Sequence, residues 1–373
     1  MIQTDTLIIG AGPAGLAIAG RLAQAGRPYT IIEESQFVGN AWRNHYERVH
    51  LHTMKEFSHL PHVPFPKSAP RYIPRVQMVE YLEAYAQRFG IQPMFGEKAV
   101  SGRQEEGKWI VNTSGGQIIE TEHLVLATGV NRHPNIPQWP GQDQFQGEIL
   151  HSRLYKTGAA YRGKNVLVVG MGNTGAEIAL DLFEQGANAS LSVRGPVNIV
   201  MRDTFGNPIQ RTSMMIGKLP TWLGDPIGRF LANATVGNLS PYGLNRPDMA
   251  PSKQLRTLGK TPVIDVGTIR QIKRGNIRVF RGIQSFGKSE VNFTDGQSLQ
   301  LDAVVLATGY MPSVTDVLEG VDSCLNDQGN PTALWSDDHP GLYFLGFDPY
   351  SNGILKGIHD DSEKILNQIA ANA

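Results

Sequence analysis

Short apolar runs that lead into glycine-rich turns recur along this chain. The first run covers residues 6–9 and is followed by the turn GAGPAG at residues 10–15. Residues 16–23 then carry apolar side chains at helical spacing, and a second apolar run at residues 29–32 leads into Glu33. A strand, a glycine turn, a helix, a second strand and an acid in this order predict a dinucleotide-binding unit.

Each residue type in this unit has a physical reason. Gly10 permits the tight turn, Gly12 lets a pyrophosphate approach the backbone, and Gly15 lets helix and strand pack closely. The helix N-terminus offers free amides and the positive end of the dipole to phosphates, and Glu33 can accept hydrogen bonds from a ribose. The candidate cofactor contacts here are Gly10, Gly12, Pro13, Ala14, Gly15 and Glu33.

The same pattern returns about 160 residues later. An apolar run at 165–169 precedes the turn GMGNTG at 170–175, a helix is predicted at 176–185, and a strand at 189–193 ends at Arg194. Arginine at this place suits the 2′-phosphate of NADP, whereas an acid selects an unphosphorylated ribose. A solvated surface arginine is the alternative interpretation of Arg194. The candidate contacts are Gly170, Gly172, Asn173, Thr174, Gly175 and Arg194.

The remaining pattern predicts an α/β chain with two domains. A helix is expected at 76–89 and a closing helix at 354–371, and residues 203–260 show no clear pattern. Short strands are expected at 99–100, 109–111, 117–119, 124–129, 261–267, 277–280 and 303–310, with a hairpin at 287–301 and a last strand at 342–347. Two strands end in Ala-Thr-Gly, at 127–129 and 307–309, and we expect these ends to mark the crossings between domains.

We therefore predict two Rossmann-like dinucleotide-binding domains, the second inserted into the first. Residues 1–153 and 304–373 are assigned to a discontinuous FAD domain, and residues 154–303 to an NADP domain.

Composition narrows the class of protein. Lys plus Arg and Asp plus Glu both number 34 in 373 residues, so no net charge favours nucleic acid or an anionic membrane. The single cysteine, Cys324, excludes a redox cysteine pair and indicates a reducing compartment. The first strand starts almost at once, which leaves no room for a signal peptide, and no apolar run is long enough to span a membrane. A cytoplasmic protein is expected.

Five histidines lie between residues 45 and 62 without a metal-binding pattern, and no metal site is assigned.

With these motifs in place, the chain resembles the flavin-containing monooxygenases over nearly its whole length. Residues 145–155 fit the family fingerprint through Phe145, Gly147, His151 and Tyr155. At the end of this fingerprint, the related Baeyer–Villiger enzymes usually carry Trp-Pro. This chain has Tyr155-Lys156, which favours the flavin-containing branch. The fit to the plant YUCCA-type branch is closer still, in segments 51–57, 172–177 and 259–267.

The resemblance implies an enzyme that uses FAD, NADPH and O2. It implies a C4a-hydroperoxyflavin that gives one oxygen atom to a small soft nucleophile, at N or S, or to an activated carbonyl such as indole-3-pyruvate. The fingerprint residues are interpreted as coupling the domains and shaping the NADP site, not as proton carriers; His151 as a general base is the less favoured alternative. The alternatives are a thioredoxin-reductase-like pyridine-nucleotide oxidoreductase, an uncoupled NADPH oxidase and a non-catalytic nucleotide sensor. A homodimer is compatible with these features.

His52 is the one catalytic candidate. Animal members of the family carry an asparagine near the flavin in the matching segment, so His52 is a candidate donor to the flavin or its peroxide. A structural loop histidine is the equal alternative. The other assigned cofactor contacts are Trp42, Arg43, Val100, Ala127, Thr128, Gly353 and Leu355.

Overall fold

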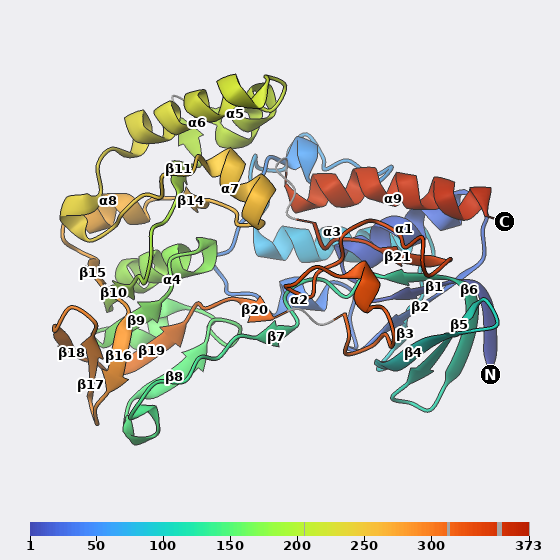
Figure 1. The fold of residues 1–373 in the computed structure, drawn as a ribbon, viewed down its shortest axis with the longest axis horizontal. Helices are drawn as coiled ribbons and strands as arrows, with labels where there is room; N and C mark the ends of the chain where they lie inside the picture. The colour runs from blue at the N-terminus through green and yellow to red at the C-terminus, as the bar shows by residue number, and fades with distance from the viewer. Residues whose placement is uncertain (205, 312–313, 349–352, 373) are drawn as a thin grey trace. The chain divides into compact units, whose positions relative to one another are not determined.

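The computed structural model describes residues 1–204, 206–311, 314–348 and 353–372. The chain divides into two compact units, each built on a sheet with helices packed against it (Figure 1). The first unit comprises Met1–Asn44, Thr53–His133 and Tyr310–Ala373, and the second comprises His45–His52 and Pro134–Gly309. One Rossmann-like unit is therefore inserted into another, as the sequence predicts.

The sheet of the first unit combines a parallel half with an antiparallel half. Its order among the described residues is β3-β2-β1-β6-β5-β4, with β21 also paired to β6. The strands are β1 (Ile2–Ile9), β2 (Tyr29–Glu33), β3 (Met94–Phe95), β4 (Ala99–Glu105), β5 (Lys108–Thr113), β6 (Ile118–Leu126) and β21 (Leu342–Phe344). The parallel neighbours β2, β1 and β6 have apolar ends buried on both faces, which explains their continuous hydrophobic runs.

β6 corrects one expectation. The sequence predicts separate strands at 117–119 and 124–129, but residues 118–126 form one strand that pairs with β1 along its whole length. The polar stretch at 120–123 interrupts the apolar pattern without interrupting the backbone pairing, because strand hydrogen bonds do not depend on side-chain polarity.

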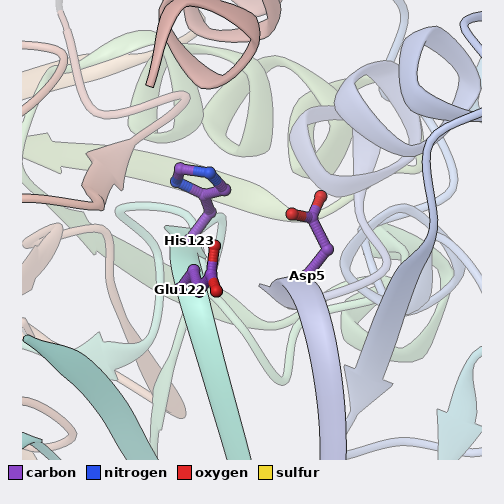
Figure 2. Close-up of side chains that lie close together, drawn as sticks. All are labelled: Asp5, Glu122 and His123. Atoms are coloured by element: carbon purple, nitrogen blue, oxygen red, sulfur yellow. The ribbon is translucent and has the colours of Figure 1, made fainter. Parts of the chain in front are cut away.

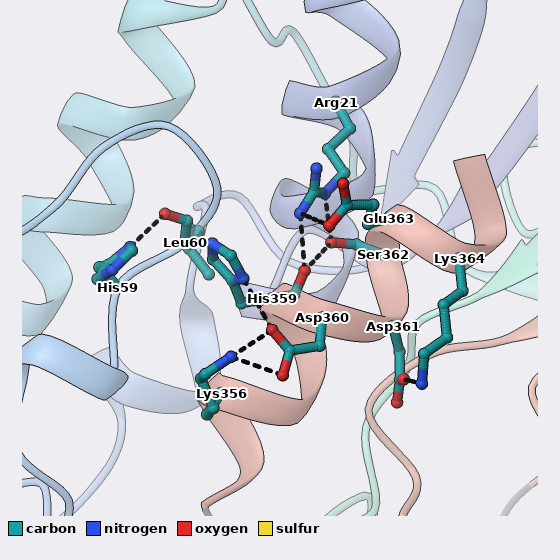
Figure 3. Close-up of polar contacts among 10 residues, drawn as sticks. All are labelled: Arg21, His59, Leu60, Lys356, His359, Asp360, Asp361, Ser362, Glu363 and Lys364. Carbon is teal, nitrogen blue, oxygen red and sulfur yellow. Dashed lines mark hydrogen bonds and ion pairs between the residues drawn. The ribbon is translucent and has the colours of Figure 1, made fainter. Parts of the chain in front are cut away.

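Two helices of the first unit are locked together by a buried arginine. Its helices are α1 (Pro13–Gln24), α2 (Asn40–Arg43), α3 (Arg75–Arg88) and α9 (Ile354–Ala371), with short turns η1 (Lys55–Phe57) and η5 (Asp322–Cys324). Arg21 of α1 is 7% exposed and reaches α9 (Figure 3). Its Nε donates to Ser362 Oγ at 2.9 Å, its Nη2 donates to the carbonyl oxygen of His359 at 2.9 Å, and Glu363 lies 3.6 Å from Nη2. This contact holds the closing helix against the helix that follows the first glycine turn.

The sheet of the second unit is parallel and has the order β15-β10-β9-β19-β8. Its strands are β8 (Glu148–His151), β9 (Asn165–Val169), β10 (Asn188–Ser192), β15 (Arg278–Phe280) and β19 (Ala303–Leu306). Because β8 and β19 belong to this sheet, the predicted borders after residues 153 and 303 are wrong. The crossings fall after residues 133 and 309, close to the two Ala-Thr-Gly strand ends, and residues 45–52 also belong to this unit.

The remaining elements of the second unit surround this sheet. They are η2 (Gln142–Gln144), η3 (Gly158–Tyr161), α4 (Asn173–Glu184), β11 (Ile199–Met201), β12 (Asp203–Thr204), β13 (Asn207–Pro208), α5 (Ile209–Ile216), α6 (Thr221–Val236), η4 (Ser240–Tyr242), α7 (Pro251–Leu258), β14 (Val263–Asp265), α8 (Thr268–Lys273), β16 (Ile283–Phe286), β17 (Glu290–Phe293) and β18 (Ser298–Gln300). The two-residue strands β7 (His133–Pro134) and β20 (Tyr310–Met311) stand at the crossings. None of the described helices has the length and apolar character that a membrane crossing requires.

A buried histidine of β6 stands in a cluster of charged groups. His123 is 3% exposed, and its ring lies near Asp5 of β1 and its neighbour Glu122 (Figure 2). These three residue types can ligate a metal, but Arg27 Nη2 already lies 3.4 Å from Asp5 Oδ2 and supplies a positive charge. We therefore interpret the cluster as an internal ion pair beside a histidine.

His123 makes the folded protein sensitive to acid. Burial lowers the pKa of His123 below its ordinary value of 6.5; Asp5 opposes the shift, Arg27 adds to it and Glu122 opposes it. A lowered pKa means that the folded state binds fewer protons than the unfolded state, so this contribution to stability is complete above pH 6.5 and is lost as the pH falls below it.

We expect His123→Gln to lose less of its free energy of unfolding than the wild type between pH 7 and pH 5, because glutamine does not titrate. Urea unfolding at both pH values measures this, with the exposed His50→Gln as the control. An unchanged pH dependence in His123→Gln would contradict the expectation.

Candidate functional site

In the first glycine turn, Gly10 and Gly15 are required by close packing, whereas Gly12 faces open space. Gly10 has φ +107°, and a Cβ there would lie 2.7 Å from the carbonyl oxygen of Ala127. A Cβ on Gly15 would lie 1.8 Å from the carbonyl oxygen of Gly10. A Cβ on Gly12 would meet no described atom within 4 Å. The open space lies at the N-cap of α1, where the free backbone amides of the first helical turn favour an anion; Pro13, at its first position, has no amide hydrogen.

Glu33 links this turn to the segment after β2 through its two carboxylate oxygens. Oε2 accepts the amide of Ala11 at 2.8 Å, and Oε1 accepts the amide of Ser35 at 2.9 Å. A carboxylate has about four acceptor positions, so Glu33 can still accept hydrogen bonds from a ribose. Glu33 therefore has a structural role that the sequence pattern did not reveal, and its ribose contact stays a prediction.

Thr128 has an unused hydroxyl beside the turn. Its Oγ1 is buried and has no hydrogen-bond partner in the part of the chain that the structure describes. The equivalent residue of the second Ala-Thr-Gly strand end, Thr308, donates from Oγ1 to the carbonyl oxygen of Asn135 at 2.5 Å. A buried hydroxyl without a partner is costly, so Thr128 fits a site that receives a polar ligand.

The other predicted contacts of the first unit differ in how well they suit a ligand. Arg43 of α2 forms an ion pair with Glu83, and its guanidinium lies 4.9 Å from the ring centroid of Phe37. Its charge is therefore already neutralised within the unit. Trp42 is half-buried on the same helix.

Three further predicted contacts lie outside these turns. Val100 is 47% exposed on β4, and Leu355 is 3% exposed in α9 and so belongs to the core. Gly353 is the N-cap of α9 and has φ +102°. Burial gives no support to Leu355 as a ligand contact.

The second glycine turn repeats the geometry of the first. Gly170 has φ +103°, and a Cβ there would lie 2.6 Å from the carbonyl oxygen of Ala307. A Cβ on Gly175 would lie 2.1 Å from the carbonyl oxygen of Gly170, whereas one on Gly172 would meet none of the described atoms within 4 Å. Thr174 is half-buried in the first turn of α4. Both turns therefore pack their first glycine against an Ala-Thr-Gly strand end and leave the middle glycine open.

The segment 259–267 supports this second turn. Asn173 Oδ1 accepts the amide of Ile264 in β14 at 2.7 Å, which ties the start of α4 to that strand. Asp265 is buried, and its carboxylate accepts the amides of Gly267 and Ile269 at the start of α8. Burial raises the pKa of Asp265, and these hydrogen bonds oppose the shift. Segment 259–267 thus stabilises the second glycine turn through its hydrogen bond to Asn173.

Arg194 and a second arginine, Arg281, follow two adjacent strands of the second sheet. Arg194 is exposed after β10, and the adjacent parallel strand β15 ends just before Arg281. Ser192 Oγ donates to the carbonyl oxygen of Arg281 at 2.8 Å, which pins the two strand ends together. Arg202, eight residues after Arg194, is engaged elsewhere, because its Nε donates to Asp203 Oδ2 at 3.0 Å. The sequence did not predict Arg281 as a companion of Arg194, because the two strands they follow are adjacent only through the order of the sheet. The one indication in the sequence was an arginine directly after a predicted strand.

The fingerprint residues have structural roles inside the second unit. Phe145 packs edge-on against Phe286 with ring centroids 5.5 Å apart. His151 uses both ring nitrogens, because Nε2 lies 3.1 Å from the carbonyl oxygen of Gly309 and Nδ1 accepts the amide of Arg153 at 3.2 Å. Burial lowers the pKa of His151, so its neutral form is favoured. His151 thus has a structural contact at each ring nitrogen, and its exclusion as a proton carrier stays a prediction.

Two more fingerprint positions complete this arrangement. A Cβ on Gly147 would lie 2.6 Å from the Phe145 ring and 2.7 Å from the carbonyl oxygen of Asp302. Tyr155 is buried and donates to Asp181 Oδ2 of α4 at 2.6 Å.

His52 is also held within the second unit. It ends the segment His45–His52, and its Nε2 contacts Glu177 Oε1 of α4. Sequence reasoning did not predict Glu177 as a partner, because the two residues are 125 positions apart.

Two dinucleotide-type turns in two Rossmann-like units define a pyridine-nucleotide oxidoreductase. The family described as pyridine nucleotide-disulphide oxidoreductase matches residues 7–205. The chain is 40% identical to the probable indole-3-pyruvate monooxygenase YUCCA3 of Arabidopsis thaliana, over 91% of this chain and 81% of that protein. It is 38% identical to the indole-3-pyruvate monooxygenase YUCCA1 of Oryza sativa subsp. japonica, over 97% and 90%. The chain belongs to the flavin-containing monooxygenase family, with relatives of the YUCCA type, and is a monooxygenase.

Solved structures agree on the fold. A flavin-containing monooxygenase from Stenotrophomonas maltophilia superposes with a TM-score of 0.76 at 21% identity, covering 100% of this chain and 99% of that one. An oxidised steroid monooxygenase bound to NADP gives 0.78 at 20% identity, covering 100% and 86%.

Proposed function

We propose that this protein is an FAD- and NADPH-dependent monooxygenase that acts on indole-3-pyruvate or a closely similar aryl α-keto acid. The observation that carries the cofactor assignment is the repeated glycine turn with an open middle glycine, one in each unit. The substrate assignment is supported by relatives at 36–40% identity that are named for indole-3-pyruvate.

The residues present fit both cofactors. In the first unit, the free backbone amides of the first turn of α1 would bind the pyrophosphate of FAD. Glu33 would accept hydrogen bonds from a ribose of the cofactor, and the Thr128 hydroxyl would donate one to it. In the second unit, the amides beside Gly172 would bind the pyrophosphate of NADPH. FAD, when bound, supplies the redox chemistry by accepting a hydride from NADPH and passing electrons to O2.

Arg194 and Arg281 are the proposed pair for the 2′-phosphate of NADPH. Two guanidinium groups at adjacent strand ends can each form charge-assisted hydrogen bonds with a dianion. The exposure of both residues leaves their donors accessible.

The proposed reaction has a defined balance. An α-keto acid, O2, NADPH and a proton would give the acid one carbon shorter, CO2, water and NADP+. One oxygen atom enters the new carboxyl group as the bond between the keto carbon and the carboxyl carbon breaks, and the other leaves as water. NADPH is the reductant. A disulfide reductase would require a redox cysteine pair, and the sequence contains only Cys324.

The holoenzyme, given NADPH and indole-3-pyruvate in air, is expected to form product and consume NADPH in equimolar amounts. Mass spectrometry under 18O2 should find one labelled oxygen in the product. NADPH consumption matched by H2O2, with no labelled product, would overturn the proposal and indicate an uncoupled NADPH oxidase. A cytoplasmic location and a homodimeric state stay predictions, and light scattering in solution measures the second.

A further inference from the structure

One face of α4 carries three acids that all contact other parts of the second unit. Glu177, Asp181 and Glu184 are spaced by four and three residues, which places them on the same side of the helix. Glu177 contacts His52, and Glu184 forms an ion pair with Arg48. The segment His45–His52 therefore lies along the helix that starts at the second glycine turn.

Glu177 is buried and receives two donors. It is 4% exposed, and a buried carboxylate is costly unless hydrogen bonds or charges compensate it. One donor is His52 Nε2, and the other is the Tyr46 hydroxyl. Burial raises the pKa of Tyr46 well above its ordinary value, and Glu177 raises it further, so Tyr46 stays a neutral donor.

This contact determines which nitrogen of His52 carries a proton. A carboxylate only accepts hydrogen bonds, so Nε2 must be protonated to bond Glu177. Among the described residues, none forms a hydrogen bond with His52 Nδ1. Nδ1 is therefore the nitrogen left for a bound ligand, on a side chain that remains 15% exposed.

We propose that Glu177 is a positioning residue that orients His52 and keeps a proton on Nε2, so that Nδ1 is the atom available to a ligand of the monooxygenase reaction. This inference rests on the proposed function for its ligand, but the tautomer of His52 is a property of the chain itself. Acids behind histidines commonly act in this way: their loss costs roughly tenfold to a hundredfold at metal sites and about 10⁴-fold in kcat in a serine-protease triad.

The first test uses the purified flavoprotein and no substrate. Ring 15N chemical shifts of histidine-labelled protein, assigned with His52→Leu, are expected to show His52 protonated at Nε2 in the wild type. They should show the same in Glu177→Gln, whose side-chain oxygen can still accept, and a tautomer mixture in Glu177→Leu. A mixture in the wild type, or no change in Glu177→Leu, would overturn the inference.

The second test measures coupling, as product formed per NADPH consumed. Glu177→Leu is expected to lower this ratio about tenfold or more, and Glu177→Gln to keep most of it. The double variant with His52→Leu is expected to give the same ratio as His52→Leu alone. Glu184→Gln is the matched control, because it loosens the same segment at Arg48 without touching His52, and its ratio should stay at the wild-type value. Additive losses, or an equal loss in Glu184→Gln, would indicate a structural role.

The two tests separate the inference from the proposed function. If the wild type makes no product but His52 is protonated at Nε2, the proposed substrate is rejected and the tautomer assignment stands. If Glu177→Leu does not fold, the wild-type spectrum and the Glu177→Gln variant still decide the tautomer.

Discussion

Gly12→Val is expected to fold normally and to lose FAD. Gly12 has φ −79° and ψ −172°, an extended conformation that valine adopts readily, and a Cβ there would meet no described atom within 4 Å. The new side chain would instead fill the space where the pyrophosphate must approach the backbone. We expect FAD affinity to fall at least about 100-fold, or ~2.7 kcal/mol.

The matched control is Gly172→Val in the second turn. Its backbone is also extended, with φ −86° and ψ −173°, and its surroundings are equally open in the described chain. This variant should keep its yellow colour and lose NADPH binding. Flavin absorbance per protein and NADPH titration measure the two effects, and thermal unfolding of the apoproteins checks the fold. Full FAD occupancy in Gly12→Val would contradict the assignment of the first turn.

Arg194→Ala is expected to weaken NADPH and to leave NADH nearly unchanged. A guanidinium can form bidentate hydrogen bonds with the 2′-phosphate, and hydrogen bonds to charged groups are typically worth ~1.5–3 kcal/mol. The dissociation constant and KM for NADPH should therefore rise roughly tenfold to a hundredfold. Because Arg194 is exposed, the free energy of unfolding should change little.

Two companion variants test the geometry of this site. Arg281→Ala should act in the same direction as Arg194→Ala, because the two arginines follow adjacent strands. Arg202→Ala should have a smaller effect on the NADPH-to-NADH preference, because its guanidinium is bonded to Asp203. Equal weakening of both nucleotides in Arg194→Ala would show that this residue is not the phosphate contact.

The sequence predicted the parts of the fold that depend on local pattern. Both glycine turns, their strands and helices, and the closing helix Ile354–Ala371 follow from apolar periodicity and glycine position. The inserted arrangement was also predicted, because the Ala-Thr-Gly strand ends repeat. The structure adds a reason for Gly10 and Gly170 that the sequence pattern does not contain: a Cβ at either position would collide with the carbonyl oxygen of Ala127 or Ala307.

What the sequence could not predict depends on tertiary neighbours. The domain borders were misplaced because no local sequence pattern indicates that β8 and β19 join the second sheet. Residues 203–260 gave no pattern because α6 is interrupted by Gly224, Pro226 and Gly228 and exposes apolar side chains such as Trp222 and Phe230. The neighbouring helices α5 and α7 have only eight residues each, too few for a clear periodicity. The Glu177–His52 contact joins residues far apart in the chain, which no spacing rule covers.

The placement of His45–His52 determines how this protein can be cut into independently folding pieces. A fragment of residues 134–309 would contain the complete second sheet but would lack these eight residues. Glu177 would lose the His52 and Tyr46 donors, and Glu184 would lose Arg48. Leaving a buried charge without its partner typically costs ~3–5 kcal/mol, a large share of a domain's stability. A stable excised fragment must therefore carry the octapeptide with it, grafted through a linker or supplied as a peptide.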